Sequence, residues 1–318
     1  MNTTLEAFSL LMAVSAIAVY ALAFIIFAVE LGQRVAPAEP AVAAVAPQRV
    51  GQLATAVITP VAPPVTALPA TSRWGRVGLA LTVIGWVLNT VAVVTRGIAG
   101  GRVPWANMYE FALTGIAIIV GVFLAVQFWK RLAFLGVFVT GFALLALVLA
   151  TVNFYVAVVP LPPALQSVWI VVHVFVAILG TAFFGIGAAL SVVQLLQARR
   201  AAAGGAGLTF LQSLPGADVL ENLAYRLNVI GFVFWTFTLI FGAIWAERAW
   251  GRYWGWDTKE VWTFIIWTIF AGYIHARATR GWRGSRSAWL GIIGFAAVLF
   301  NFTIVNLFFK GLHAYSGL

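Results

Sequence analysis

Cysteine is absent from this 318-residue chain. Its absence excludes disulfide bonds, thiol redox chemistry, an iron–sulfur cluster and any thiolate metal ligand within the chain. Charged residues are also scarce, at 9% of the sequence, while 63% of the residues are hydrophobic. So few charges cannot supply the polar surface of a soluble domain, and we therefore expect an integral membrane protein. Histidine occurs only as His173, His275 and His313.

Apolar segments of about 20 residues, the length that crosses a bilayer as a helix, recur along the chain. They predict an all-α bundle of about eight transmembrane helices. The predicted spans are residues 6–30, 74–95, 109–129, 132–152, 166–197, 222–246, 258–279 and 287–310. A segment rich in Ala, Val and Pro separates the first two spans. We therefore divide the chain into a first transmembrane helix (1–32), a flexible inner linker (33–73) and a membrane domain (74–318).

The net charge of +10 is interpreted as membrane topology rather than as nucleic-acid binding. If the N-terminus lies outside, most Lys and Arg residues fall in the inner connections, as the positive-inside rule requires. Both termini are then outside, and so is the connection between the sixth and seventh spans. We expect no nucleic-acid partner.

That connection, residues 245–262, has an unusual composition. It holds five of the 14 tryptophans, and most of its polar residues are charged. Gly251 and Gly255 are expected to interrupt helix, and Asp257 and Glu260 have the spacing of a capping box at the start of the seventh span. The two carboxylates are interpreted as helix caps, with an acid–base role as the alternative.

Stacking surfaces and cations would lie together in this segment. An extended chain around Trp254 and Trp256 would project both indoles to one side, with Arg252 and Lys259 beside them. Anchoring at the bilayer interface also explains tryptophan at this level, but anchoring requires neither the close glycines nor the charges. A flat, apolar ligand with two carboxylates would use all of these features, and haem fits that description.

Haem iron needs axial ligands, which are commonly histidines. His173 is expected about two turns into the fifth span from its outer end, and His313 follows the eighth span on the same side. These two are therefore the candidate ligands of one iron, with a packing role as the alternative. His275 is expected near the inner face. It is either a structural residue or a ligand of a second haem site that a partner protein completes.

The outer segment resembles the tryptophan-rich WWD signature of haem-handling membrane proteins. The residues that carry this resemblance, and that it predicts to contact haem, are Trp245, Trp250, Gly251, Arg252, Tyr253, Trp254, Gly255, Trp256, Asp257, Lys259, Glu260 and Trp262. A segment with Pro104, Asn107, Tyr109 and Glu110 is similar to an outer-loop motif of the CcsA (ResC) family, as is the ending from Gly311 to Tyr315. The resemblance covers the chain from about Trp74 to its end. Thr258 and Ala314 depart from the family pattern, which commonly has Pro and Ser there.

The resemblance implies system II cytochrome c biogenesis. Proteins of this family work with CcsB (ResB) to move haem b outward and attach it to the Cys-x-x-Cys-His motif of apocytochrome c, as a cytochrome c synthase (haem lyase). His173 and His313 match the external haem ligands of the family. His275 matches a membrane-embedded haem ligand, and the second ligand of that iron comes from the partner subunit. Arg252 and Lys259 are candidate contacts of the haem propionates.

The implied partners are a separate CcsB-like subunit, apocytochrome c and a thiol-reducing protein. The implied location is the cell membrane, or the thylakoid membrane of a plastid, with the active face outside the cytoplasm.

Three alternatives remain open. A system I relative (CcmC- or CcmF-like) shares the WWD signature and exchanges haem with a chaperone, although the Asn107–Glu110 segment favours the CcsA family. A haem transporter without a catalytic role would need polar groups along a path through the bundle. A structural membrane subunit would use its tryptophans only as anchors and would not retain haem.

Overall fold

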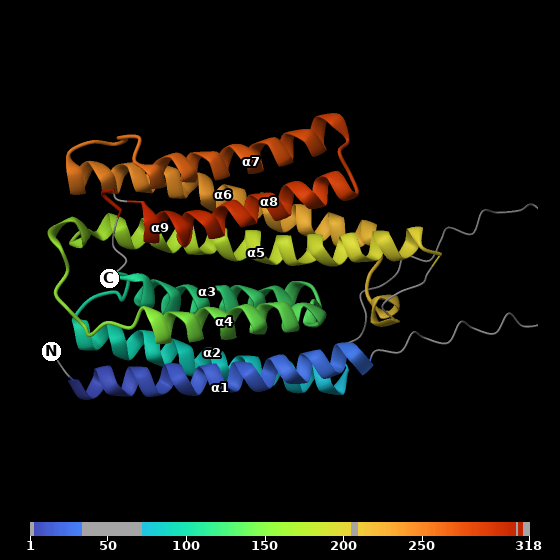
Figure 1. The fold of residues 1–318 in the computed structure, drawn as a ribbon, viewed down its shortest axis with the longest axis horizontal. Coiled ribbons are helices and arrows are strands. Elements are labelled where there is room, and N and C mark those ends of the chain that lie inside the picture. Colours follow the sequence, from blue (N-terminus) through green and yellow to red (C-terminus); the bar gives the residue numbers. More distant parts are fainter. Residues whose placement is uncertain (1–2, 34–71, 205–208, 310, 314–318) are drawn as a thin grey trace, which may run out of the picture.

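The computed structural model describes residues 3–33, 72–204, 209–309 and 311–313, and these residues form helices and their connections, with no β-strand (Figure 1). The α-helices are α1 (Thr3–Gln33), α2 (Arg73–Gly100), α3 (Met108–Trp129), α4 (Gly136–Asn153), α5 (Val168–Ala202), α6 (Ala217–Trp250), α7 (Thr258–Arg280), α8 (Ser285–Phe302) and α9 (Ile304–Phe308). Three short 3-10 helices lie in the connections: η1 (Ala133–Leu135), η2 (Pro163–Leu165) and η3 (Thr209–Ser213). The predicted linker, residues 33–73, lies almost wholly outside the described residues.

Seven described segments are long and apolar enough to cross a membrane: α1, α2, α3, α5, α6, α4 together with η1, and α8 together with α9. The chain is therefore a multi-pass helical membrane protein, as predicted. α7 has 23 residues but is less apolar than the others, because it carries polar side chains such as Lys259, His275 and Arg277. It nevertheless runs beside α6 and α8 in the bundle (Figure 1).

The predicted boundaries differ from the structure mainly in two helices. α6 is longer than its predicted span of 222–246 at both ends. The last predicted span, 287–310, is interrupted at Thr303, where α8 ends and the short helix α9 begins. The Thr303 hydroxyl donates to the carbonyl of Leu299 at 2.7 Å. A threonine that bonds back to the preceding turn commonly bends a helix.

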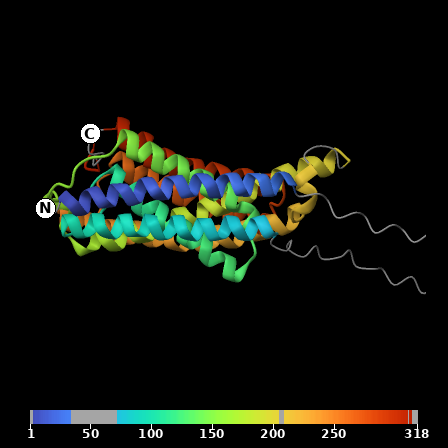
Figure 2. The same ribbon diagram turned by 90° about the horizontal axis from the view of Figure 1, so that it is seen from below.

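The helices form two groups that run along the long axis of the molecule (Figures 1 and 2). α1 to α4 make one group and α5 to α9 the other, and α3 against α5 is the principal contact between them. The start of α1, the α6–α7 connection and α9 lie at the same end of the bundle (Figure 1). This is the end predicted to face outward, and its orientation in a membrane stays a prediction.

The two longest helices, α5 and α6, approach each other closely at glycines. A Cβ atom added at Gly180 would lie 3.3 Å from the carbonyl oxygen of Gly231, and one added at Gly231 would lie 2.7 Å from the ring of Phe184. Small residues at such crossings allow the close van der Waals packing that holds helices together in a bilayer. The α5–α6 pair is the frame that carries His173 and Trp245.

Candidate functional site

The connection between α6 and α7 is shorter than predicted. α6 continues to Trp250 and ends at Gly251, whose φ of 70° is the left-handed conformation that glycine tolerates. Trp245 and Trp250 are thus helical, and only residues 251–257 form the connection. The helix extends this far because neither Gly nor Pro occurs between Trp245 and Gly251.

The predicted capping box is confirmed at the start of α7. The Glu260 carboxylate accepts hydrogen bonds from the N–H groups of Gly255 at 2.8 Å and of Asp257 at 3.0 Å. Arg252 lies against the same carboxylate, with its Nη1 atom 3.6 Å from Glu260 Oε1. The Arg252 guanidinium occupies the place that a Cβ atom at Gly255 would take, so a side chain there would displace it. These contacts fold the connection onto the end of α7.

The two tryptophans of the connection do not form the expected common surface. Trp256 has a φ of 59°, so the chain is not extended at this residue. Its side chain is 73% exposed, whereas Trp254 lines the cavity described below. The two rings still meet edge to face, with centroids 5.8 Å apart. The prediction that both indoles project to one side is therefore wrong.

His173 projects from α5 onto α6 at a position that a glycine leaves open. A Cβ atom at Gly242 would lie 2.8 Å from the imidazole. The His173 Nδ1 atom lies 3.0 Å from the carbonyl oxygen of Thr238. Because a carbonyl can only accept, Nδ1 donates this hydrogen bond, and the neutral ring keeps its lone pair on Nε2. The ring also stacks on Trp245, with centroids 5.8 Å apart and planes 12° apart.

His313 reaches the same region from the segment that follows α9. Its Nδ1 atom lies 2.6 Å from the Asp257 carboxylate, and its ring meets Trp250 and Trp245 edge to face at 4.8 and 5.5 Å. Burial lowers the pKa of His313, and the hydrogen bond with His313 lowers the pKa of Asp257. At neutral pH the pair is therefore a neutral imidazole and a carboxylate. Nδ1–H is donated to the carboxylate, and Nε2 is again the nitrogen that remains for a ligand.

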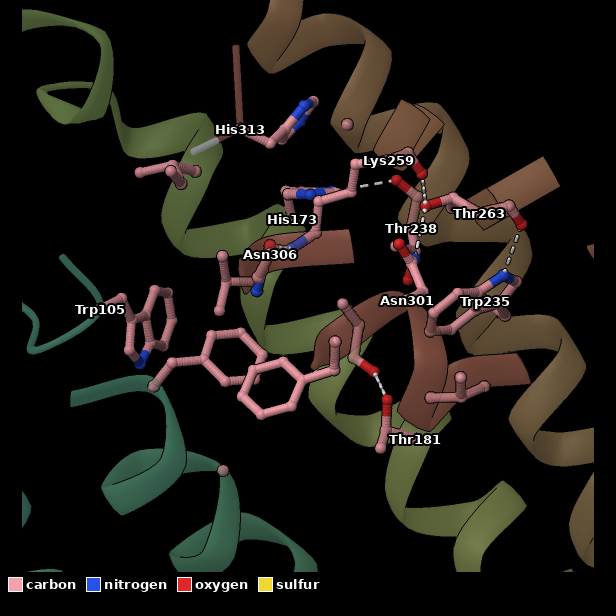
Figure 3. A pocket seen from close by; sticks show the side chains of 18 of the residues that line it. Trp105, His173, Thr181, Trp235, Thr238, Lys259, Thr263, Asn301, Asn306 and His313 are labelled. Atoms are coloured by element: carbon pink, nitrogen blue, oxygen red, sulfur yellow. Dashed lines mark hydrogen bonds between the residues drawn. The ribbon is translucent and has the colours of Figure 1, made fainter. Parts of the chain in front are cut away.

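Both histidines line one cavity of about 240 Å³, which lies between the two groups of helices (Figure 3). Side chains of α3 and α4, including Phe111, Ile116 and Phe142, contribute apolar lining. The other predicted residues that line it are Asn107, Trp245, Tyr253, Trp254, Lys259 and Glu260. The predicted residues of the outer segment that do not line the cavity are Trp250, Gly251, Arg252, Gly255, Trp256, Asp257 and Trp262. Trp262 packs instead on Phe300, with ring centroids 4.4 Å apart.

Two asparagines that line this cavity, Asn301 and Asn306, were not predicted (Figure 3). Asn301 is 5% exposed and donates to the Thr263 hydroxyl at 3.3 Å, while its Oδ1 atom has no hydrogen-bond partner among the described residues. Asn306 accepts a hydrogen bond from the Lys259 ammonium. Amides are costly inside apolar spans and therefore mark candidate functional positions. The two asparagines of the last predicted span were the signal that could have found them.

The predicted outer-loop motif with Pro104, Asn107, Tyr109 and Glu110 supports another wall of the cavity. Asn107 caps α3 by accepting a hydrogen bond from the N–H of Glu110 at 2.9 Å. The fully buried Glu110 forms ion pairs with Arg96 at 3.1 Å and Arg102 at 2.6 Å. This network fixes the connection between α2 and α3, from which Trp105 faces the cavity (Figure 3).

Pro104 and Tyr109 belong to the same support and do not line the cavity. The Pro104 carbonyl accepts a hydrogen bond from Thr114 at 3.2 Å, and the buried Tyr109 ring meets Tyr155 edge to face at 5.1 Å. Trp105, between them, was not predicted. Its buried indole N–H has no hydrogen-bond partner among the described residues.

His275 is not brought to the other two histidines. It lies near the C-terminal end of α7, is exposed, and does not line the cavity. The expectation that it cannot share an iron with His173 and His313 agrees with this placement.

Comparison with known proteins places this geometry in a family. The model of the cytochrome C assembly protein family matches residues 105–313, which run from Trp105 to His313. The chain belongs to this family. Curated relatives named "Cytochrome c biogenesis protein CcsA" include that of Guillardia theta, 33% identical over 261 residues that cover 76% of this chain and 86% of the relative. That of Synechococcus sp. (strain JA-3-3Ab) is 33% identical over 307 residues, covering 78% and 88% of the two chains.

The CcsA family is thus the one to which the chain belongs, and membership implies a role in cytochrome c assembly. The protein of Gloeobacter violaceus, 31% identical, likewise covers 76% of this chain and 87% of its own length. The matched relatives therefore account for about three quarters of the chain.

We predict that replacing Glu110 with alanine destabilises the fold. The change leaves the buried Arg96 guanidinium without its Glu110 partner, and breaking a buried ion pair typically costs about 3–5 kcal/mol. Thermal unfolding of the purified protein should show a clear loss of stability. Glu247→Ala is the matched control, because among the described residues Glu247 pairs only with the exposed Arg248. Equal unfolding temperatures for Glu110→Ala and the control would contradict this structural role.

Proposed function

We propose that this protein binds haem in the cavity at the outer end of the bundle and presents it to apocytochrome c for thioether attachment. The proposal rests above all on one observation. His173 and His313, which are 140 positions apart in the chain, line the same cavity, and each has its Nδ1 atom engaged by an acceptor. Both rings therefore keep Nε2 as the nitrogen that can ligate iron.

The surroundings of the two rings support iron ligation over a packing role. A metal-ligating histidine almost always donates its other ring N–H to a carboxylate or a carbonyl, which fixes the tautomer and the ring orientation. His173 does so to Thr238 and His313 to Asp257. Trp245 contacts both imidazoles. Aromatic and apolar walls below them suit a porphyrin, which is flat and apolar over most of its surface.

The attachment of haem to the thiols requires little acid–base chemistry from this chain. Each thiol of the Cys-x-x-Cys-His segment adds its sulfur to one carbon of a haem vinyl group and its hydrogen to the other, so no oxidant is consumed. The histidine of that segment takes the place of one axial ligand, which brings the thiols beside the vinyl groups. The protein contributes proximity and orientation, and its axial ligands tune the iron.

Of the two predicted propionate contacts, the structure favours Lys259. Arg252 is paired with Glu260 and does not line the cavity. Lys259 lines the cavity, donates to Asn306, and forms no ion pair with a carboxylate of the described residues. An ammonium group in a largely apolar cavity, with no carboxylate of the described residues in ion-pair contact, favours an anionic ligand. A haem propionate would supply that charge.

The exposed side of α7 supports a second, shared haem site. Thr268, Gly272, His275 and Thr279 follow one another at helical spacing and are all exposed, and a Cβ atom at Gly272 would meet nothing within 4 Å. Small residues on a transmembrane helix allow another helix to pack closely. We include in the proposal that a CcsB-like subunit packs there and provides the fellow ligand of His275. The cavity does not reach His275, so a continuous haem path inside this chain receives no support.

Axial ligation by two histidines has a recognisable absorption spectrum. The full-length protein purified with its partner should show a low-spin, bis-histidine haem spectrum, because two imidazoles complete the iron coordination. That spectrum should weaken in both His173→Ala and His313→Ala. His275→Ala is the internal comparison: because His275 lies outside the cavity, this variant should give the full spectrum once haem is added. If haem supplied in excess gives no spectrum in the intact complex, haem binding is refuted.

Lys259→Met should lower the affinity for haem about 10- to 100-fold, since a hydrogen bond to a charged group contributes about 1.5–3 kcal/mol. Absorbance titrations of the complex with haem and with haem dimethyl ester test the cause. The ester lacks both carboxylates and should bind the variant and the wild type equally. Arg248→Met is the matched control and should leave haem affinity within about twofold, because Arg248 is an exposed cation that does not line the cavity. A loss of affinity that is the same for haem and its ester would assign Lys259 to packing.

Gly272→Leu should reduce the amount of CcsB-like subunit that copurifies with the chain, because a large side chain would hold the helices apart. His275→Ala should leave copurification intact and lower the haem content of the complex, while haem added from outside still gives the outer-site spectrum. Phe264→Leu, also exposed on α7 but not small, serves as the control for copurification. Unchanged copurification in Gly272→Leu would remove this surface from the interface.

A further inference from the structure

Asp257 makes a contact that its role as a helix cap does not require. Its carboxylate oxygen Oδ2 accepts the hydrogen bond of His313 Nδ1 at 2.6 Å. The two residues are 56 positions apart, so the contact joins the start of α7 to the segment after α9. No other hydrogen bond of the His313 side chain occurs among the described residues. Its ring also meets the rings of Trp245 and Trp250 edge to face.

The same carboxylate is packed against the backbone that carries His313. A Cβ atom at Gly311 would collide with Asp257 Oδ1. The segment therefore approaches the carboxylate at a distance that only glycine permits. His313 follows two residues later, in a turn outside any helix, so no regular secondary structure fixes the direction of its ring. The direction of the ring, and with it that of Nε2, thus depends on a single hydrogen-bond acceptor and on the contacts with the two indoles.

His173 is held differently. Its Nδ1 atom bonds a neutral backbone carbonyl, and its ring is set by the long helix α5 and by the contact with Gly242 on α6. A carboxylate draws the Nδ1 proton more strongly than a carbonyl does, which makes the other ring nitrogen a better electron donor. The two histidines are therefore unequal as ligands, and the inequality comes from Asp257.

We infer that Asp257 is a positioning residue that aims His313 Nε2 at the iron and strengthens this axial bond relative to that of His173. The inference rests on the proposed haem site and deepens it. Asp257 touches neither the cavity nor the iron; it acts through His313.

The test compares Asp257→Asn with the wild type in the full-length protein purified with its partner. Asparagine caps helices as well as aspartate does, so α7 keeps its start, and only the charge and the acceptor strength change. Haem affinity should fall about 10- to 100-fold, the usual effect of removing such a partner of a metal ligand. The low-spin spectrum should shift toward high spin, and the midpoint potential of the iron should rise because the ligand donates less charge.

Three further variants separate positioning from a general structural effect. Gly311→Ala leaves Asp257 unchanged but pushes the segment away from the carboxylate, so it should weaken the spectrum in the same direction. Asp218→Asn makes the same substitution in the first turn of α6, where the side chain is exposed, and should change nothing. In a His313→Ala background, adding Asp257→Asn should cause no further loss, because the residue acts only through His313.

The outcomes distinguish this inference from the function on which it rests. If His173→Ala and His313→Ala lose the bis-histidine spectrum while Asp257→Asn keeps the wild-type affinity, spectrum and potential, the positioning role is wrong and the haem site stands. A further loss from Asp257→Asn in the His313→Ala background would also overturn it. If the wild-type complex binds no haem, the proposed function itself fails.

Discussion

The close packing of α5 on α6 is the constraint on which the site depends. In a bilayer, helices gain little from burying apolar surface, so their association relies on close contact. Gly180, Gly231 and Gly242 provide that contact along the pair, and the last of them receives the ring of His173. The same approach brings the imidazole to the Thr238 carbonyl. A bulkier residue at Gly242 would thus displace the proposed iron ligand His173 as well as a helix.

The rest of the site is assembled where helices end. Regular helix leaves backbone groups unsatisfied at its ends, and here those groups are used to hold functional side chains. Glu260 closes the start of α7 and fixes the short connection that carries Trp254. Asp257 shares this helix start and turns its carboxylate to His313. A site at the helix ends also lies where a water-soluble protein, such as the apocytochrome c of the proposed function, can reach it.

The sequence could predict the helices, the capping box and the histidines, because each depends on local pattern or on rarity. It could not predict contacts between distant segments. Nothing in residues 245–262 indicates that Asp257 would meet His313. Nor does it indicate that Arg252 would pair with Glu260 while Lys259 formed no ion pair among the described residues. The left-handed conformation of Trp256 was equally hidden, because a non-glycine residue there is set by the surrounding fold. Trp105 was not predicted, because only the folded chain shows that it lines the cavity. Its indole N–H has no hydrogen-bond partner among the described residues, and this too is evident only from the structure.

The extent of the family match bears on how the cavity is closed. The matched region begins at Trp105, yet the connection that holds Trp105 is fixed by Glu110 together with Arg96 of α2. Arg96 also pairs with Glu6 of α1 at 3.2 Å. The first helix, which precedes the region that the family model matches, is therefore linked by one buried guanidinium to the connection that holds Trp105. The helices α1 and α2, which precede the matched region, thus help to hold the cavity in shape through these ion pairs. None of their described residues lines the cavity.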